Sequence, residues 1–236
     1  MLDTNLKQTL KTYLQNLKTE VELVVSLDDS AKANEVEQLA TEIAELSDLV
    51  SLRRDDAAME RKPAMLVRSV ANDTHITFAG VPLGHEFTSL VLALLHSGGH
   101  PIKVEADTIE QIRQLPGSFA FETYISLSCQ TCPEVVQALN IMSAINPNIT
   151  NVMIDGAMFQ DEVSERNVMA VPSVFLNGEL FSQGAITLEK IIQKIDVNAE
   201  KRQAEALKSK ADFDVLVVGG GPAGASAAVY AARKGL

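Results

Sequence analysis

The sequence predicts an α/β protein built from two similar modules, followed by a linker and a glycine-rich strand–helix unit. Patterns of apolar strands and amphipathic helices alternate along the chain, and their order repeats at an offset of 100 residues. A glycine-rich turn follows an apolar run near the end of the 236 residues. The apolar share of 46% and the charged share of 22% are typical of a folded globular protein.

The first module is expected over residues 1–117. The segment "LVVSLDDSAKANEVEQLA", from Leu23, has an apolar strand pattern followed by a polar turn and an amphipathic helix pattern. Strand patterns follow at "DLVSLRRD" and, directly after a proline, at "RKPAMLVR". The module closes with a further strand and a helix in "FAGVPLGHEFTSLVLALLHSG".

The second module is expected over residues 118–196 and has the same order, β-α-β-(α)-β-β-α. Its segments are "TYISLSCQTCPEVVQALN", "NITNVMIDG", "MAVPSVFLNG" and "FSQGAITLEKIIQKID". At the offset of 100, Asp29 takes the place of Cys129 and Lys32 that of Cys132. The matched order of elements favours duplication over chance, with the cysteine pair in the second copy alone.

The end of the chain differs from the two modules in amino-acid composition. Residues 197–211 are charged and poor in large apolar side chains, which is typical of a linker. Residues 212–236 contain an apolar run, Gly219-x-Gly221-x-x-Gly224 and an alanine-rich helix pattern. This spacing is the phosphate-cradling turn of a Rossmann-type dinucleotide-binding unit. The acidic ribose ligand expected about 20 residues later is missing from the sequence, so we expect residues 212–236 not to bind a dinucleotide by themselves.

Composition excludes several classes of partner. The chain has no tryptophan and only 5% aromatic residues, which argues against a carbohydrate groove or a base-stacking platform. Its net charge of −11 opposes binding to nucleic acid. The N-terminus lacks the order of a signal peptide, and the longest apolar run is too short to span a bilayer. We expect a cytoplasmic protein without membrane or nucleic-acid partners.

Cys129 and Cys132 are the only cysteines and are spaced C-x-x-C where a strand leads into a helix. Backbone N–H groups and the dipole at a helix N-terminus stabilise a thiolate, so Cys129 is predicted to be the attacking nucleophile. Cys132, one turn later, is predicted to be the more buried, resolving thiol. Thiolate stabilisation is expected from backbone groups and from the hydroxyls of Ser128 and Thr131, which can alternatively cap the helix.

Other interpretations of the cysteine pair remain open. They are a structural disulfide, half of a zinc site, two unrelated core cysteines, or an incidental dithiol in a non-catalytic docking module. A zinc site needs two more ligands from a set of four histidines, His75, His85, His96 and His100. The two glycines between His96 and His100 oppose such a site, so no metal is expected and dithiol redox chemistry is favoured.

Four segments together resemble the family of flavoproteins that belong to bacterial alkyl hydroperoxide reductases. They are "LGHEFTSLVLALLHSGGHP", "ETYISLSCQTCPEVVQALNIM", "RNVMAVPSVFLNG" and "FDVLVVGGGPAGASAAVYAARKG". The resemblance implies two contiguous thioredoxin-like folds, the first without cysteines. It also implies a redox-active CxxC that receives electrons from an FAD- and NADH-binding part of the full-length chain. Residues 212–236 would be the truncated start of that FAD-binding domain, and we expect this piece to bind neither FAD nor NADH. The acceptor would be the disulfide of a two-cysteine peroxiredoxin, which reduces hydroperoxides, and the full-length protein would be a homodimer and this piece a monomer.

The resemblance also implies roles for two residues outside the CxxC. Pro172 would lie in a cis-proline loop that packs against the cysteines, and Pro63 would be its counterpart in the first module. Glu86 would approach the CxxC from the first module and accept a proton, although it can equally be a helix-N-terminal glutamate that interacts with the dipole. A stand-alone protein-disulfide reductase is the main alternative function, but such proteins usually keep a CxxC in both halves.

Overall fold

The computed structural model describes residues 1–196, 215, 217, 219 and 221–235. They belong to two units, Met1–Ile195 and Asp196–Leu236. The predicted linker over 197–211 lies outside the described residues. Among the residues that the structure describes, no helix has the length and apolar character needed to cross a membrane.

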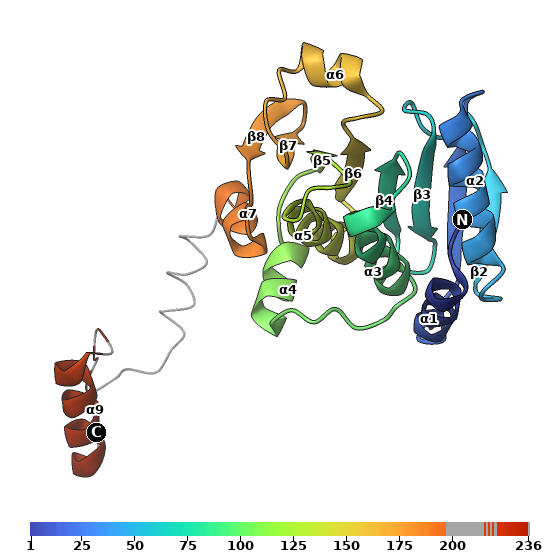
Figure 1. Cartoon of the computed structure of the whole chain (residues 1–236). Helices are drawn as coiled ribbons and strands as arrows, with labels where there is room; N and C mark the ends of the chain where they lie inside the picture. The colour runs from blue at the N-terminus through green and yellow to red at the C-terminus, as the bar shows by residue number, and fades with distance from the viewer. Residues whose placement is uncertain (197–214, 216, 218, 220, 236) are drawn as a thin grey trace. The chain divides into compact units, whose positions relative to one another are not determined.

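The first unit contains two halves with the same order of elements (Figure 1). The first half comprises α1 (Thr4–Leu14), β1 (Val21–Ser26), α2 (Ala31–Ala44), β2 (Val50–Arg54), β3 (Ala64–Ser69), β4 (Thr74–Ala79), the 3-10 turn η1 (Gly84–Glu86) and α3 (Phe87–Ser97). The second half comprises α4 (Ala106–Arg113), β5 (Phe119–Ile125), α5 (Cys132–Ile145), β6 (Ile149–Asp155), α6 (Gln160–Glu165), β7 (Ser173–Leu176), β8 (Glu179–Gln183) and α7 (Leu188–Ile195). The predicted repeat is confirmed, and the optional helix of the repeat, α6, is present in the second half and not in residues 55–63 of the first.

The two halves share one eight-stranded sheet in the order β2-β1-β3-β4-β6-β5-β7-β8. They meet where β4 pairs in parallel with β6, with Ile76 opposite Asn151 and Ala79 opposite Ile154. The sequence predicts two modules packed together, but not that their sheets are continuous. Because β1, β4, β5 and β6 are parallel to one another, their carboxyl ends lie at the same edge of the sheet.

Most helices cover one face of the sheet. Alternate residues of the strands, such as Leu23 and Phe78, pack there against Val36 of α2 and Leu90 of α3. A second cluster joins Phe121 of β5 to α4, α5 and α7. The opposite face is covered over the second half by α6, which stands apart from the other helices in Figure 1.

The helix α4 packs with the second half, although it precedes the predicted division at 117/118. Ile112 and Leu115, at the end of α4, are buried in the core of the second half. This packing places α4 with residues 118–196, whereas the predicted division at 117/118 assigns it to the first module.

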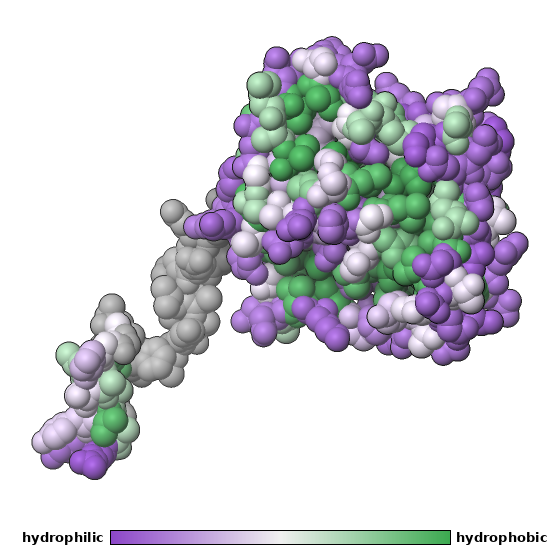
Figure 2. Space-filling model, viewed as in Figure 1, coloured by the Kyte–Doolittle hydropathy of each residue, from purple (hydrophilic) through white to green (hydrophobic). Residues whose placement is uncertain are grey.

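Figure 2 shows apolar side chains between the helices in the middle of one face and a mostly hydrophilic rim.

In the second unit, α9 (Pro222–Lys234) forms the predicted helix after the glycine-rich turn. Gly221 is its N-cap and Gly235, at φ +74°, ends it in the left-handed conformation. The sequence predicts a strand over the apolar run before the turn. Of that run, Val215 and Val217 are described and neither is in a strand, while the rest lies outside the described residues.

Candidate active site

The CxxC lies at the edge of the sheet where four strands end. β5 ends at Ile125, the chain turns over residues 126–131, and α5 begins at Cys132. The Cys129 N–H donates to the Ser126 carbonyl at 2.9 Å, which closes the turn. Pro133 is tolerated in the first turn of α5 because an N–H there has no partner within the helix.

Cys129 and Cys132 form a disulfide with their Cα atoms 5.5 Å apart. Cys132 is fully buried in the apolar core with Val136, whereas Cys129 is half-exposed. The backbone N–H of Cys132 points at the Sγ atom of Cys129, at 3.2 Å. In the reduced protein this N–H, at the start of a helix, favours a thiolate on Cys129. The two sulfurs therefore differ as predicted, one accessible and one enclosed.

The two hydroxyls predicted near the cysteines are used differently. The Thr131 hydroxyl lies 3.7 Å from the Cys129 Sγ atom and makes no side-chain hydrogen bond to the helix end. The Ser128 hydroxyl instead lies 3.0 Å from that of Ser126. Thr131 is thus placed to hydrogen-bond the sulfur, and Ser128 contributes to the turn.

The Pro172 loop packs against the exposed cysteine. The Val171–Pro172 peptide bond is cis, and the Val171 carbonyl oxygen lies 4.0 Å from the Cys129 Sγ atom. The loop is held by the Ser173 hydroxyl, which donates to the Ala170 carbonyl at 2.6 Å. Met169, just before it, is 86% exposed. Exposed backbone and an apolar side chain beside a reactive sulfur can receive a polypeptide from another protein.

In the first half, the Lys62–Pro63 bond is also cis, yet the position of the cysteines is occupied by charged groups. Asp29 is exposed, and Lys32 forms an ion pair with Glu35 at 2.8 Å. Neither residue can exchange a disulfide, so this half carries no redox group of its own at that position.

Glu86 belongs to the first half but lies in a turn that contacts the loop before the CxxC. The N–H of His85, an exposed residue, donates to the Leu127 carbonyl at 3.4 Å. Gly84 has φ +59°, and a Cβ atom there would lie 3.0 Å from that same carbonyl oxygen. The close approach of η1 to this loop therefore depends on a glycine.

The Glu86 side chain is fully buried, and neither carboxylate oxygen has a hydrogen-bond partner among the described residues. Burial raises its pKa to about 7, and the nearby Ser89 hydroxyl offsets this rise only in part. A buried carboxyl group that changes charge near neutral pH can accept or donate a proton in the working range of an enzyme.

Sequence reasoning missed a second buried acid at the same sheet edge. Asp155 ends β6 opposite Ile125, and the N–H of Gly156 donates to the Ile125 carbonyl at 3.0 Å. Burial raises the pKa of Asp155, against the hydrogen bond from the Ala157 N–H. The signal in the sequence is an acid directly after the apolar run of "NVMID".

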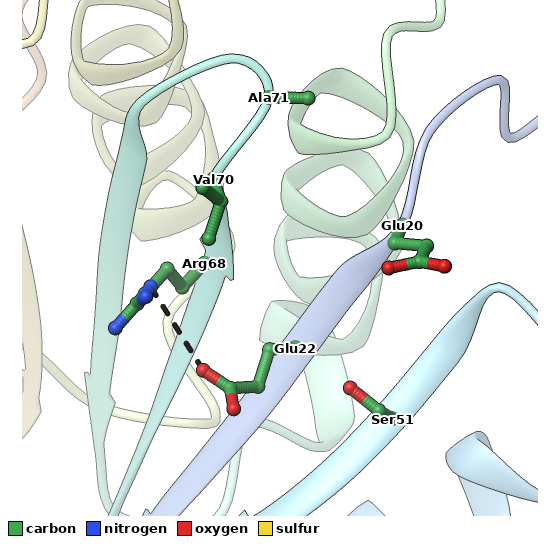
Figure 3. Close-up of a pocket in the computed structure, with 6 residues that line it drawn as sticks. All are labelled: Glu20, Glu22, Ser51, Arg68, Val70 and Ala71. Carbon is green, nitrogen blue, oxygen red and sulfur yellow. Dashed lines mark ion pairs between the residues drawn. The ribbon is translucent and has the colours of Figure 1, made fainter.

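A hollow of about 490 Å³ lies on the other face of the sheet in the first half (Figure 3). It is lined by Glu20, Glu22, Ser51, Arg68, Val70 and Ala71. Glu22 is neutralised there by Arg68, at 3.8 Å, and by Arg53, at 3.1 Å. Because Glu22 lies near the amino end of β1, the hollow is at the opposite end of the strands from the cysteines.

The glycine-rich turn of the second unit fits a phosphate group. Gly219 has φ +101°, and a Cβ atom on Gly224 would collide with the Gly219 carbonyl oxygen. Gly221 begins α9, so the free N–H groups of the helix face the turn. The geometry of the turn therefore requires glycine at positions 219 and 224, whereas a Cβ atom on Gly221 would meet open space.

Comparisons with known proteins agree with this geometry. Residues 120–196 match the family described as thioredoxin domain. The whole chain is 58% identical to the alkyl hydroperoxide reductase AhpF of Pseudomonas putida, of which it covers 45%. Over its whole length, the chain is similar to AhpF proteins. It corresponds to the N-terminal part of AhpF and spans about half the length of the curated relatives that it matches.

Solved structures show the same fold. The N-terminal domain of alkyl hydroperoxide reductase AhpF from Enterococcus faecalis (V583) has a TM-score of 0.76 at 29% identity, covering 83% of this chain and all of that one. A protein disulfide oxidoreductase from Aeropyrum pernix has a TM-score of 0.71 at 23% identity, covering 85% of this chain and 96% of that one. A thioredoxin domain with a CxxC disulfide, in a chain similar to AhpF, is a disulfide oxidoreductase module.

Proposed function

We propose that this N-terminal part of an AhpF-family protein is a dithiol relay that reduces the disulfide of a two-cysteine peroxiredoxin. The observation that carries the proposal is the asymmetry of the two sulfurs. Cys129 is half-exposed beside the Val171 carbonyl, and Cys132 is enclosed in the core. A partner disulfide can therefore reach Cys129 alone.

The relay begins with Cys129 as a thiolate and Cys132 as a thiol. The Cys129 thiolate attacks one sulfur of the partner disulfide, forming a mixed disulfide and releasing the other partner sulfur as a thiolate. Cys132 then loses its proton and attacks the Cys129 sulfur, which forms the Cys129–Cys132 disulfide and releases the second partner thiolate. Two electrons pass to the partner, whose thiolates take up protons.

Glu86 is proposed as the acceptor of the Cys132 proton. Its turn packs against the loop that precedes Cys129, its carboxylate is buried, and its pKa of about 7 suits transfer at neutral pH. The buried Cys132 thiol needs such a base because water does not reach it.

The relay is returned to its reduced form by the rest of the full-length chain. We propose that Gly219, Gly221 and Gly224 hold the pyrophosphate of FAD there, with N–H groups at the start of α9 directed at the phosphates. When bound there, FAD would supply electrons that originate from NADH. With a peroxiredoxin as acceptor, the whole system detoxifies alkyl hydroperoxides and hydrogen peroxide in the cytoplasm.

Stopped-flow thiol transfer tests the relay. The reduced chain is mixed with an oxidised two-cysteine peroxiredoxin, and Cys129→Ser and Cys132→Ser are compared. We expect fast transfer by the unmodified chain and a trapped mixed disulfide through Cys129 in the Cys132→Ser variant. Transfer no faster than that by dithiothreitol would contradict the assignment of the partner.

A general protein-disulfide reductase is the second candidate function, because the exposed Val171–Met169 segment beside Cys129 suits many extended chains. Insulin reduction separates the two functions. Comparable turnover with insulin and with peroxiredoxin would favour the general reductase, and a marked preference for peroxiredoxin would favour the specific relay.

A further inference from the structure

Four charged side chains form a network on the α6 face of the sheet, here called the Arg61 network. Its members are Arg61, Glu122, Glu162 and Arg166. The guanidinium group of Arg61 donates to both Glu162 oxygens, each at 2.9 Å, and to a Glu122 oxygen at 2.5 Å. Arg166 donates to the other Glu122 oxygen at 2.5 Å. The two arginines thus neutralise the two glutamates.

The network joins the two halves of the protein. Arg61 precedes Pro63 in the first half, whereas Glu122 lies on β5 and Glu162 on α6. The four side chains are between 17% and 29% exposed, so the charges are largely withdrawn from solvent. Removing one partner of such a pair leaves a carboxylate desolvated and unpaired, which weakens the contact far more than the loss of a surface ion pair does.

The network also fixes the segment that carries the Pro172 loop. Arg166 ends α6, only five residues before Val171. Its guanidinium group lies over the ring of Phe175, 5.1 Å from the centroid, and 5.8 Å from that of Tyr124. The Tyr124 hydroxyl in turn donates to Glu162 at 2.8 Å. The chain on both sides of the loop is therefore held by the same charges.

We propose that Arg61, supplied by the half without cysteines, is a positioning residue that sets the Pro172 loop against Cys129 for docking of a protein disulfide. Arg61 holds Glu162 and Glu122. These residues fix α6 and β5, and the loop between α6 and β7 then places the Val171 carbonyl 4.0 Å from the Cys129 sulfur. The inference rests on the proposed function, since docking of the partner is measured by the rate at which its disulfide is reduced.

The role predicts a selective defect. A small aromatic disulfide such as DTNB needs only access to the Cys129 sulfur, whereas a protein disulfide also needs the backbone of the loop. A displacement of the loop by even 1 Å can lower the rate of a positioned reaction by one to two orders of magnitude. A side chain that only stabilises the fold would affect both acceptors alike.

The experiment compares Arg61→Gln and Glu162→Gln with the unmodified chain, using oxidised peroxiredoxin, insulin and DTNB as acceptors. We expect kcat/KM for peroxiredoxin to fall about tenfold in both variants and the rate with DTNB to stay within about twofold. The double variant should be no worse than either single variant, because the two residues act as one unit. Arg113→Gln, which breaks the exposed pair with Glu110, is the control and should change neither rate.

Two further measurements keep the test decisive. Hydrogen exchange of the backbone N–H groups of residues 166–171 should be faster in Arg61→Gln and unchanged in Arg113→Gln. Arg61→Lys keeps the charge without the forked geometry and should restore the peroxiredoxin rate only in part, and it replaces Arg61→Gln if that variant does not fold. Equal losses with peroxiredoxin and DTNB, or unchanged rates and exchange, would overturn the inference. If the unmodified chain reduces insulin but not peroxiredoxin, the proposed partner is wrong, and the insulin-to-DTNB ratio then tests Arg61.

Discussion

The hydroxyl of Thr131 lies 3.7 Å from the Sγ atom of Cys129, within the turn that precedes α5. The two x residues of the motif, Gln130 and Thr131, are uncharged, so this hydroxyl and the Cys132 N–H are the hydrogen-bond donors that the structure places beside the sulfur. The contact has a measurable consequence in the reduced protein.

Thr131→Val should slow alkylation of Cys129 by iodoacetamide at pH 7 by roughly fivefold, the equivalent of about 1 kcal/mol for one hydrogen bond. The physical reason is that the thiolate loses a donor. The measurement is the alkylation rate of the reduced chain by mass spectrometry. Thr88→Val, an exposed threonine on α3, serves as the control, and an equal slowing in both variants would remove the special role of Thr131.

Glu86→Gln should abolish a pH dependence of stability. Burial raises the Glu86 pKa from 4.5 to about 7, so the folded protein holds this proton more tightly than the unfolded chain does. The resulting stabilisation is fully present below pH 4.5 and is lost as the pH rises through 7, a change of about 3 kcal/mol.

Urea unfolding of the oxidised protein at pH 4.5, 6 and 8 measures this effect. The difference in the free energy of unfolding between Glu86→Gln and the unmodified chain should change by about 3 kcal/mol over that range. Glu134→Gln, which removes an exposed carboxylate in the first turn of α5, should show no such shift. A constant difference across the three pH values would mean that Glu86 titrates in its ordinary range.

His96 should contribute a pH dependence of the opposite sign. Burial, aided by His100, lowers the pKa of His96 from 6.5 to about 4. The unfolded chain therefore binds the proton more readily than the folded protein. The contribution of neutral His96 to the free energy of unfolding is fully present above pH 6.5 and is lost as the pH falls towards 4. We expect the free energy of unfolding to fall by roughly 2 kcal/mol over this range, a figure reduced for the partial exposure of the ring. NMR titration of the ring protons checks it, and a midpoint near 6.5 would contradict it.

Gly84→Ala should destabilise the protein by about 2 kcal/mol, of which roughly half is the cost of a positive φ for alanine. The other half comes from the Leu127 carbonyl oxygen, 3.0 Å from the added Cβ atom. Gly178→Ala isolates the first contribution, because Gly178 has φ +88° and open space around its Cβ position. Equal free energies of unfolding for the two variants would show that η1 can move away without cost.

Much of the fold followed from local patterns. The strand–helix order and the proline directly before β7 each depend on a few consecutive residues, whereas α5 begins at Cys132, later than the sequence indicates. The asymmetry of Cys129 and Cys132 follows from helix geometry, because a residue three positions before the first helical turn remains outside it.

The rest depends on contacts between distant segments. The pairing of β4 with β6 has no signature in either strand, because both mix apolar with polar residues and either could have formed an edge. In the Arg61 network, Arg61 contacts Glu122, which is 61 positions later in the chain, and Glu162, which is 101 positions later. Each of these charged residues resembles an ordinary surface residue when taken alone. The unpaired burial of Glu86 likewise depends on the packing of η1 against α5, which local sequence does not specify.

The β4–β6 junction joins the last strand of one half to the second strand of the next. The two halves are therefore related by a translation along the sheet, and not by a symmetry that would close the pair on itself. The free edges of the eight-stranded sheet, β8 and β2, are the counterparts of the two strands that meet inside it. A further copy could in principle extend the sheet by the same step, without limit. Arg53 and Arg54 lie along β2 and are paired with Asp55 and Asp56, and this row of charges opposes the addition of another strand at that edge.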